Sequence, residues 1–385
     1  MRLSINLGLL ARLAVGLSVV AVGAALAGGA TAASGVVGHV YVNDNTAGTN
    51  TIAAFDRHAD GTLTPLQGSP FVAGGAGTGS GIGSQGALQI TSDGRYLLAA
   101  DAGSNQISVL RIGPDGGLTP VGGGPVSSGG NEPVSIAVHG SLVYVANAGN
   151  GGSNYTGFTL NAGGHLRPLA SSTVSLPDGS TPGDVFFNGD GTRLVGTRVG
   201  TSLIDSFVVG HDGRLTAAPG SPFAAEGVGP FGSEFRPTDA GQLFVSNAHG
   251  GAGNGSVSAF ADGSDGTLTS IGSSPYPDNQ TAPCWVEISR DGQFLFTVNT
   301  ASNSVSSYAI AADGSLSLLG STALATANAG AEDARLAPDG QTLWVVDTGA
   351  DSISAFSVSG GSLTELASSP TTLPSGAKPF GIVVT

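Results

Sequence analysis

The stretch Asp60-Gly61-Thr62-Leu63 is the first of seven copies of a short marker in which a tight turn precedes a leucine. Asp-Gly and Gly-Gly pairs supply the positive φ angles that a hairpin turn requires, so each copy is expected to join two antiparallel strands. Successive leucines lie 47 to 55 residues apart. The other copies are Asp115-Gly116-Gly117-Leu118, Gly163-Gly164-His165-Leu166, Asp212-Gly213-Arg214-Leu215, Asp265-Gly266-Thr267-Leu268, Asp313-Gly314-Ser315-Leu316 and Gly360-Gly361-Ser362-Leu363.

A second turn lies about 25 residues before the first marker in each repeat, as in Asp93-Gly94-Arg95 and Asp291-Gly292-Gln293. Alternating runs such as Leu295-Phe296-Thr297-Val298-Asn299 follow it, and a third strand comes next, as in Asn303-Ser304-Val305-Ser306. Period-two runs rich in Val, Ile, Phe and Tyr are typical of strands. Each repeat therefore carries four short strands.

Four strands in about 50 residues are typical of one propeller blade. The first repeat starts at a second-strand sequence, His39-Val40-Tyr41-Val42, while the C-terminal Pro379-Phe380-Gly381-Ile382-Val383-Val384 has no blade behind it. We expect this segment to pair into the first blade as its innermost strand. The predicted fold is an all-β, seven-bladed β-propeller of four-stranded antiparallel blades, closed by the C-terminal strand.

The N-terminal segment has the pattern of an export signal. Arg2 and Arg12 flank the start, an apolar run extends from Leu13 to Ala27, and Ala30-Thr31-Ala32 offers a cleavage site. An uncleaved membrane anchor is the alternative, although the apolar run is short for a bilayer. We therefore expect a signal peptide over residues 1–33, a single propeller domain over residues 34–385, and a secreted protein with no membrane span after cleavage.

The charge and cysteine content exclude several classes of protein. With 13 basic and 27 acidic residues, the chain has a net charge of −14, which argues against nucleic-acid binding. Cys284 is the single cysteine, so no disulfide can form within the chain. The six histidines are scattered without metal-ligand spacing, so neither a metal site nor a cofactor is predicted. We expect a monomer, on the reasoning that a closed ring has no open edge to pair.

The repeats resemble two related groups of propellers. Tyr41-Val42-Asn43-Asp44 and Tyr144-Val145-Ala146-Asn147 resemble the repeat of the YVTN propellers. The Asp-Gly turn and leucine followed by Ser-Pro-Phe, as in Ser69-Pro70-Phe71 and Ser221-Pro222-Phe223, is similar to the lactonase propellers, which include 6-phosphogluconolactonase-like enzymes and fungal carboxymuconate cyclases. The resemblance covers residues 36–385 and implies the fold more strongly than the chemistry.

The polar residues that this resemblance implies are missing. Where the family often carries His-Pro-His, this chain has Thr181-Pro182-Gly183; where it carries Gly-Pro-Arg-His, this chain has Gly229-Pro230-Phe231-Gly232. A second strand that often ends in Asn-Glu here ends in Asn247-Ala248. Five expected polar groups are therefore absent, which argues against a lactonase of the usual type.

A different set of polar residues is expected at the central channel, because alternate residues of the innermost strands face it. Asp184, Glu234, Glu287 and Arg335 are the candidate catalytic residues: a carboxylate with a raised pKa can act as a general base, and an arginine can stabilise an oxyanion. Gln89, Trp285 and Asp333 are the candidate ligand-binding residues. The alternative is a solvated polar channel without a ligand.

Two functions fit these residues. The first is a non-catalytic exported propeller that binds a small molecule, a protein or a cell-surface ligand at the channel mouth and loop face; the missing family residues favour it. The second is a lactone hydrolase or cyclase with a carboxylate–arginine site at the channel mouth, favoured by the whole-chain resemblance. The first is our prediction from the sequence, and the second is the alternative.

Overall fold

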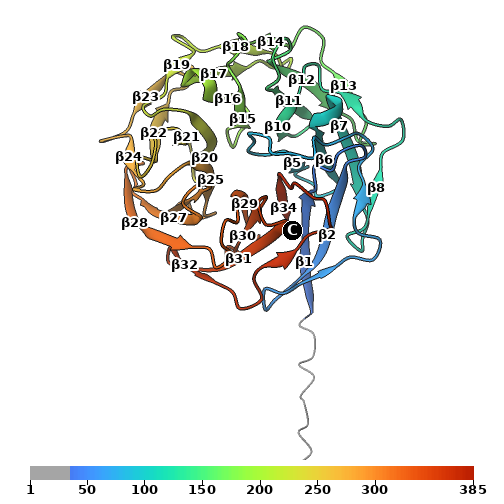
Figure 1. The fold of residues 1–385 in the computed structure, drawn as a ribbon. Coiled ribbons are helices and arrows are strands. Elements are labelled where there is room, and N and C mark those ends of the chain that lie inside the picture. The colour runs from blue at the N-terminus through green and yellow to red at the C-terminus, as the bar shows by residue number, and fades with distance from the viewer. Residues whose placement is uncertain (1–34) are drawn as a thin grey trace, which may run out of the picture. The chain divides into compact units, whose positions relative to one another are not determined.

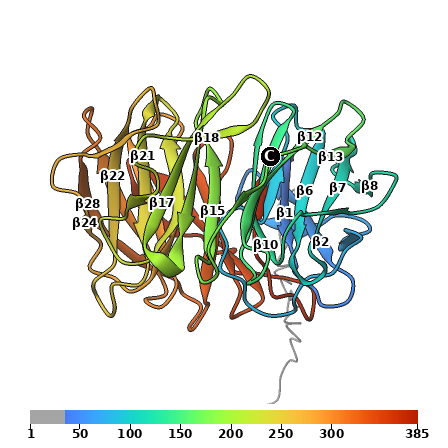
Figure 2. The same ribbon diagram turned by 90° about the horizontal axis from the view of Figure 1, so that it is seen from above.

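Seven antiparallel sheets surround a central axis in the computed structural model, which describes residues 35–385 (Figure 1). Residues 35–385 form one compact unit. The predicted signal peptide lies outside the described residues. Viewed at 90°, the blades stand side by side, with loops gathered at both ends of the strands (Figure 2). Among the described residues, no helix is both long and apolar enough to cross a membrane.

The three inner strands follow the same order in every blade, from blade 1 to blade 7. The innermost strands are β34 (Ile382–Val384), β5 (Leu88–Ile90), β10 (Pro133–His139), β15 (Pro182–Phe187), β20 (Pro230–Arg236), β25 (Pro283–Ile288) and β29 (Ala331–Leu336). The second strands are β1 (Val36–Asn43), β6 (Tyr96–Asp101), β11 (Leu142–Asn147), β16 (Arg193–Arg198), β21 (Asp239–Asn247), β26 (Phe294–Asn299) and β30 (Thr342–Asp347). The third strands are β2 (Thr51–His58), β7 (Gln106–Ile112), β12 (Asn154–Leu160), β17 (Leu203–Val209), β22 (Ser256–Asp262), β27 (Ser304–Ile310) and β31 (Ser352–Ser359).

The outermost strand is interrupted in every blade except blade 6. Its main pieces are β3 (Leu63–Pro65), β8 (Leu118–Pro120), β13 (Leu166–Pro168), β18 (Leu215–Ala217), β23 (Leu268–Ser270), β28 (Leu316–Ala323) and β32 (Ser362–Glu365). A short second piece pairs with the same third strand in six blades: β4 (Phe71–Val72), β9 (Val126–Ser127), β14 (Val174–Ser175), β19 (Phe223–Ala224), β24 (Tyr276–Pro277) and β33 (Thr371–Thr372). Two short 3-10 helices, η1 (Ala102–Ser104) and η2 (Val199–Thr201), complete the described chain.

The seven turn markers all lie between the third and fourth strands, as the sequence predicts. The second glycine or the Asp-Gly glycine of each marker has a φ between +78° and +86°, a region that disfavours other residues. In the first marker, Asp60 accepts a hydrogen bond from the backbone N–H of Thr62 at 3.0 Å, which tightens the turn. The turn chemistry therefore fixes where each blade reverses.

The C-terminal strand closes the ring, as predicted. β34 pairs antiparallel with β1, so that Tyr41 lies opposite Val383, and Figure 1 shows the C-terminus beside β1. Backbone bonds extend the pairing, since the N–H of Asn43 donates to the carbonyl of Gly381 at 3.1 Å. The first blade is thus built from both ends of the described chain.

Aromatic side chains of the second strands join neighbouring blades. The hydroxyl of Tyr41 donates to the carbonyl of Gly116 in the next blade at 2.8 Å, and Tyr144 does the same to Gly213 at 2.9 Å. Tyr96 donates to Ala162 at 3.0 Å. All three tyrosines are buried. Each hydroxyl therefore satisfies a carbonyl of the following blade's outer turn while its ring fills the space between blades.

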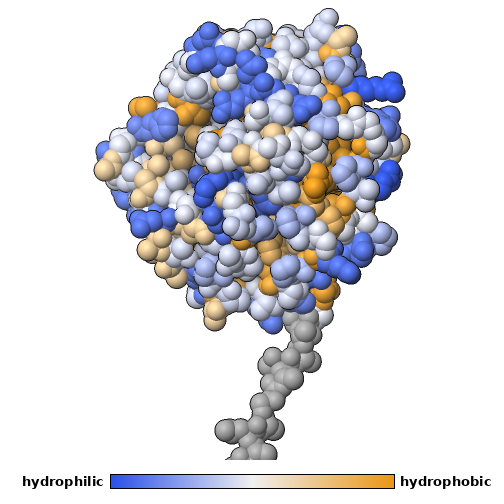
Figure 3. All heavy atoms as spheres, turned by 45° about the vertical axis from the view of Figure 1, so that its right-hand side comes forward, coloured by the Kyte–Doolittle hydropathy of each residue, from blue (hydrophilic) through white to orange (hydrophobic). Residues whose placement is uncertain are grey.

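The outer surface is mixed in polarity, and apolar residues form small separate patches on the face seen in Figure 3. Among the described residues, the exposed large hydrophobic side chains are Val36, Val37, Val72, Val228, Leu318 and Leu319.

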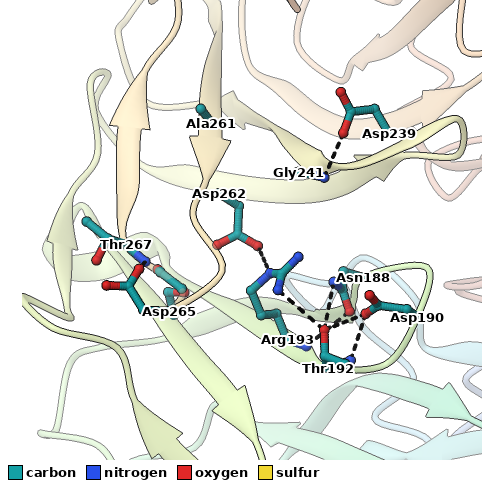
Figure 4. A network of polar contacts seen from close by, with 12 residues as sticks. Asn188, Asp190, Thr192, Arg193, Asp239, Gly241, Ala261, Asp262, Asp265 and Thr267 are labelled. Carbon is teal, nitrogen blue, oxygen red and sulfur yellow. Dashed lines mark hydrogen bonds and ion pairs between the residues drawn. The ribbon is translucent and has the colours of Figure 1, made fainter.

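An ion pair also joins neighbouring blades, in this case blades 4 and 5. Figure 4 shows Arg193 of β16 reaching Asp262 of β22. Burial raises the pKa of Asp262 to about 6, although the charge of Arg193 opposes the rise. The backbone N–H of Arg193 donates a 3.0 Å hydrogen bond to the side-chain oxygen of Asn188.

We expect Arg193→Ala to destabilise the protein by about 3 kcal/mol above pH 6, because it leaves an ionised Asp262 buried without its partner. The shift of the urea unfolding midpoint measures it. Arg214→Ala removes the same side chain from an exposed pair with Asp212 and should shift the urea midpoint much less, because solvent screens that pair. Equal losses in the two variants would contradict the importance of the buried pair.

Candidate functional site

The innermost strands contribute two rings of side chains, one nearer the start of each strand and one nearer its end. The first ring consists of Ala87, Ser135, Asp184, Gly232, Trp285, Asp333 and Gly381. The second ring consists of Gln89, Ala137, Phe186, Glu234, Glu287, Arg335 and Val383. The predicted site residues are divided between the two rings, and the structure gives the rings different roles.

A loop segment, Ser84–Gly86, spans the channel at the first ring; we call it the plug. The side-chain amide of Gln85 donates to the carbonyl of Ser233 at 3.0 Å, and its oxygen accepts the N–H of Val286 at 2.9 Å. The backbone N–H of Gln85 donates to Gly183 at 2.9 Å. The plug therefore bonds to the innermost strands of blades 4, 5 and 6. In Figure 1 the segment before β5 reaches toward the centre of the ring.

Gly86 and Ser84 extend the plug to the remaining neighbours. The N–H of Gly86 donates to Asp333 of blade 7 at 3.1 Å, and its carbonyl accepts the N–H of Ile136 of blade 3 at 3.0 Å. The hydroxyl of Ser84 donates to the carbonyl of Val134. One short segment thus bonds to five of the seven innermost strands.

Gly232 is the residue that makes room for the plug. A Cβ at this position would lie 2.0 Å from the side-chain oxygen of Gln85 and 2.7 Å from the carbonyl of Cys284. The resemblance to the lactonase propellers implies a histidine at Gly232. In this chain the side chain of Gln85 lies where any side chain at position 232 would begin.

Three of the predicted site residues belong to the first ring, and one of them, Asp333, bonds to the plug. Asp184 accepts hydrogen bonds from the hydroxyl of Ser135 at 3.0 Å and from the N–H and hydroxyl of Ser233 at 2.9 and 2.6 Å. Burial raises the pKa of Asp184 to about 7 and that of Asp333 to about 6. Trp285 is only 3 % exposed and packs on Phe231, with ring centroids 5.4 Å apart. The polar bonds of the two aspartates hold strands and plug together.

The other four predicted residues meet at the second ring. Two adjoining cavities of about 320 and 280 Å3 lie there, and both are lined by Gln89, Glu234, Arg335 and Pro237. Glu287 lines the smaller one. These residues come from blades 2, 5, 6 and 7, so the alternation read from the sequence places them at a common mouth.

Glu287 positions Arg335. A guanidinium nitrogen of Arg335 donates to one carboxylate oxygen of Glu287 at 3.0 Å, and the backbone N–H of Leu336 donates to the other at 2.8 Å. Burial lowers the pKa of Arg335, but the charges of Glu287 and Asp333 outweigh that effect and raise it. The arginine is therefore a fixed cation at the wall of both cavities.

Glu234 is the carboxylate with spare capacity. One of its oxygens, Oε2, is buried and has no hydrogen-bond partner. Burial, and then the charge of Glu287, raise the pKa of Glu234 well above its ordinary value, with Arg335 partly offsetting the rise. A carboxyl group in this state can hold a proton at a pH at which an exposed carboxyl group has lost it, and can exchange that proton with a substrate.

The opposite mouth has a different character. A cavity of about 290 Å3 there is walled by apolar side chains that include Val134, Val199 and Phe231, with Glu132 and His249 also in its lining. Thr181 and Pro182, which stand where the resemblance implies His-Pro, line the same cavity. The polar groups expected from the family are thus replaced by an apolar wall.

The plug is the structural feature of the channel that the sequence did not indicate. The segment around Gln85 has no period-two pattern and no turn signature of its own, and the partners of Gln85 lie 98 to 201 residues away.

No three His, Cys, Asp or Glu side chains within residues 35–385 come together as a possible metal site.

Comparison with protein families settles the membership of the chain. The family model described as lactonase, 7-bladed β-propeller matches residues 45–179 and 235–379. The chain belongs to this family. A search of curated protein sequences gave no match.

Solved structures agree on the fold. A candidate 6-phosphogluconolactonase of Bacteroides uniformis has a TM-score of 0.73 at 19 % identity, covering 90 % of this chain and 99 % of that one. The periplasmic gluconolactonase of Pseudomonas aeruginosa has a TM-score of 0.72 at 18 % identity, covering 90 % and 99 %. At such identity the likeness to this lactonase-family chain extends to the fold alone.

The sequence-based prediction of a non-catalytic binding propeller is contradicted by these comparisons. The family that matches is named for lactonase activity, and the similar structures carry lactonase names. That prediction gave decisive weight to five missing polar residues. Of the positions concerned, Thr181 and Phe231 line the cavity at the opposite mouth, and Gly183 and Gly232 lie against Gln85. The carboxylates and the arginine of the second ring lie at the other mouth.

Proposed function

We propose that this member of the lactonase family is a lactone hydrolase whose site is the mouth formed by Gln89, Glu234, Glu287 and Arg335. The observation that carries the proposal is the buried Oε2 of Glu234, which has no partner and belongs to a residue lining both cavities beside a fixed arginine. A carboxylate that can accept a proton from water, beside a cation that can stabilise an oxyanion, is an arrangement that promotes ester hydrolysis.

The proposed reaction uses each residue once. Arg335 donates hydrogen bonds to the lactone carbonyl oxygen and stabilises the negative charge that develops there. Glu234 accepts a proton from water as the water oxygen bonds to the carbonyl carbon. The ring C–O bond then breaks, and Glu234 returns the proton to the departing ring oxygen, which gives an open-chain hydroxy acid.

Glu287 has a positioning role in this proposal. Both of its oxygens are already bonded, one to Arg335 and one to the N–H of Leu336, so it is not available to activate water. It holds the guanidinium in a single orientation at the cavity wall. Export of the enzyme, as predicted from residues 1–33, remains part of the proposal.

The test is hydrolysis of a panel of sugar, alkyl and aromatic lactones. The release of acid at constant pH measures the rate. Arg335→Ala is expected to lower kcat about 10²- to 10³-fold, the usual effect of removing one oxyanion donor. Arg214→Ala, an exposed arginine elsewhere, should leave the rate unchanged.

Because Arg335→Ala also leaves Glu287 without its partner, near-UV circular dichroism should establish that the variant is folded. The double variant Arg335→Met with Glu287→Gln removes both charges and should be equally inactive. No turnover of any lactone by the unaltered protein, or equal turnover by all variants, would overturn the proposal.

A further inference from the structure

The second ring is divided into a charged arc and an apolar arc. Three consecutive blades, 5 to 7, contribute Glu234, Glu287 and Arg335. The remaining four contribute Val383, Gln89, Ala137 and Phe186, of which only Gln89 is polar. A ligand at this mouth therefore meets charge on one side and hydrocarbon on the other.

Apolar side chains also line part of the walls beyond the ring. The larger cavity is lined by Val138, Phe187, Phe235 and Pro237 in addition to Phe186 and Ala137. The smaller cavity is lined by Ile90, Ile288, Leu336 and Val384 in addition to Val383. Phe186 is partly exposed, which leaves part of its ring available to a ligand.

Several polar residues of the lining are already occupied within the protein. The guanidinium of Arg236 donates to the carbonyls of Gly292 and Ala311, at 2.8 and 2.9 Å, and to Gln242 at 2.9 Å. The side-chain oxygen of Asn188 accepts the N–H of Arg193 at 3.0 Å.

The ring of His139 packs over Gly191 and beside Phe187 but makes no hydrogen bond within the described residues. The polar side chains left for a ligand are therefore mainly those of Gln89, Glu234, Arg290, Arg335 and His139.

The geometry points to a lactone that carries a hydrocarbon substituent, rather than a polyhydroxylated sugar lactone, as the substrate class of this mouth. Its ester group lies against Glu234 and Arg335, and its alkyl or aryl substituent lies against Phe186 and Ala137. A sugar ring in the same place would lose water from hydroxyl groups that find no partner on the apolar arc, which is unfavourable. The inference rests on the proposed lactone hydrolysis and narrows it.

The plug supports this assignment by closing the other end of the channel. Gln85 and Gly86 fill the first ring, so the substituent cannot extend through the propeller. The cavities, about 320 and 280 Å3, suit a small ring with a short chain or a single aromatic group.

The experiment compares γ-nonalactone, γ-butyrolactone and glucono-δ-lactone as substrates. We expect kcat/KM for γ-nonalactone to exceed that for each of the other two by about tenfold or more, the scale of hydrophobic-pocket discrimination. Phe186→Ala should remove most of this preference by raising KM for γ-nonalactone more than KM for γ-butyrolactone. Phe223→Ala, which deletes the same atoms on the outer strand β19, is the matched control and should keep the preference.

A second measurement separates the two proposals. Calorimetric titration with the γ-lactam of the same pentyl chain, and with gluconolactam, reports binding without turnover. Tighter binding of the pentyl lactam, weakened by Phe186→Ala, would support the substrate class even if no lactone were hydrolysed, and then only the proposed function would fail. Preferred hydrolysis of glucono-δ-lactone, or tighter binding of gluconolactam, would overturn the substrate class and leave lactone hydrolysis standing.

Discussion

Deletion of residues 380–385 is expected to leave the protein without a cooperative fold at 25 °C. Phe380, Ile382, Val383 and Val384 are all at least nine-tenths buried, and each contributes about 1.5–3 kcal/mol on burial. Their sum is comparable to the total stability of a typical domain, about 5–15 kcal/mol. Loss of near-UV circular dichroism and of a sharp urea transition would measure the effect.

The deletion also exposes a strand edge. β1 would lose the pairing of Val40, Tyr41 and Val42 with β34, and its backbone groups would face the channel unpaired. Aggregation is therefore expected alongside unfolding. A synthetic peptide of residues 376–385 should restore the transition if the strand acts by pairing. A truncated protein with an unchanged unfolding midpoint would contradict closure of the ring by β34.

The closure of the ring was predictable because it follows from local sequence patterns and from the number of strands in the first and last repeats. The first repeat begins at a second-strand sequence and the last segment has no blade behind it, so the missing strand and the spare strand identify each other. The turn markers were equally local, since Asp-Gly specifies positive φ without help from the rest of the fold. The alternation of side chains along each innermost strand is also local, and it correctly predicted that Glu234, Glu287 and Arg335 lie in one ring.

The plug was not predictable because its position depends on partners far away in sequence. Gln85 finds Ser233 and Val286 only after blades 4 to 6 have formed. The hydrogen bond of Asp333 follows from the placement of the plug, and Asp184 is bonded by Ser135 and Ser233 of the two neighbouring blades, so the sequence could not distinguish these carboxylates from Glu234. Gly232 offered the one available signal, a glycine in a strand where the family resemblance implies a side chain.

The residues at the end of the second strands form a sequence pattern that could have predicted the role of Asn247. Asn299 donates from its amide to Ser304 and Ser306 of the third strand at 3.1 and 2.9 Å, and Asn247 makes the equivalent bonds to Ser256 and Ser258 at 3.0 and 2.9 Å. An Asn or Asp there, followed by Ser at alternate positions, is a structural repeat. Asn247 therefore has a role in the blade whether or not a catalytic residue follows it.

Ring closure does not test the predicted monomer. It satisfies the innermost strands, but each blade still has an outer edge, and β28 runs uninterrupted over Leu316–Ala323 with no charged residue. The monomer stays a prediction, and the shape of the ring alone does not require it.

Replacement of Glu234 by glutamine is expected to lower kcat for lactone hydrolysis about 10²- to 10⁴-fold, the usual contribution of general acid–base catalysis. Burial and the charge of Glu287 raise the pKa of Glu234 above its ordinary value of 4.5, so the base form appears only at higher pH. For the unaltered protein, kcat/KM should therefore rise with pH along a limb that lies above pH 4.5. The residual rate of Glu234→Gln should lack this limb.

Glu132→Gln is the matched control, because Glu132 lines the cavity at the opposite mouth of the channel. Both changes replace one carboxylate by an amide of the same shape, so a difference between them assigns the chemistry to one end of the propeller. Retention of the limb in Glu132→Gln and its loss in Glu234→Gln would place the reacting proton at the second ring. The reverse result would move the site to the apolar cavity beside Phe231 and show that the unpartnered Oε2 of Glu234 is only a buried, protonated acid. The pH limb discriminates between these outcomes better than the rate alone, because a distorted site lowers kcat without removing the titration that controls it.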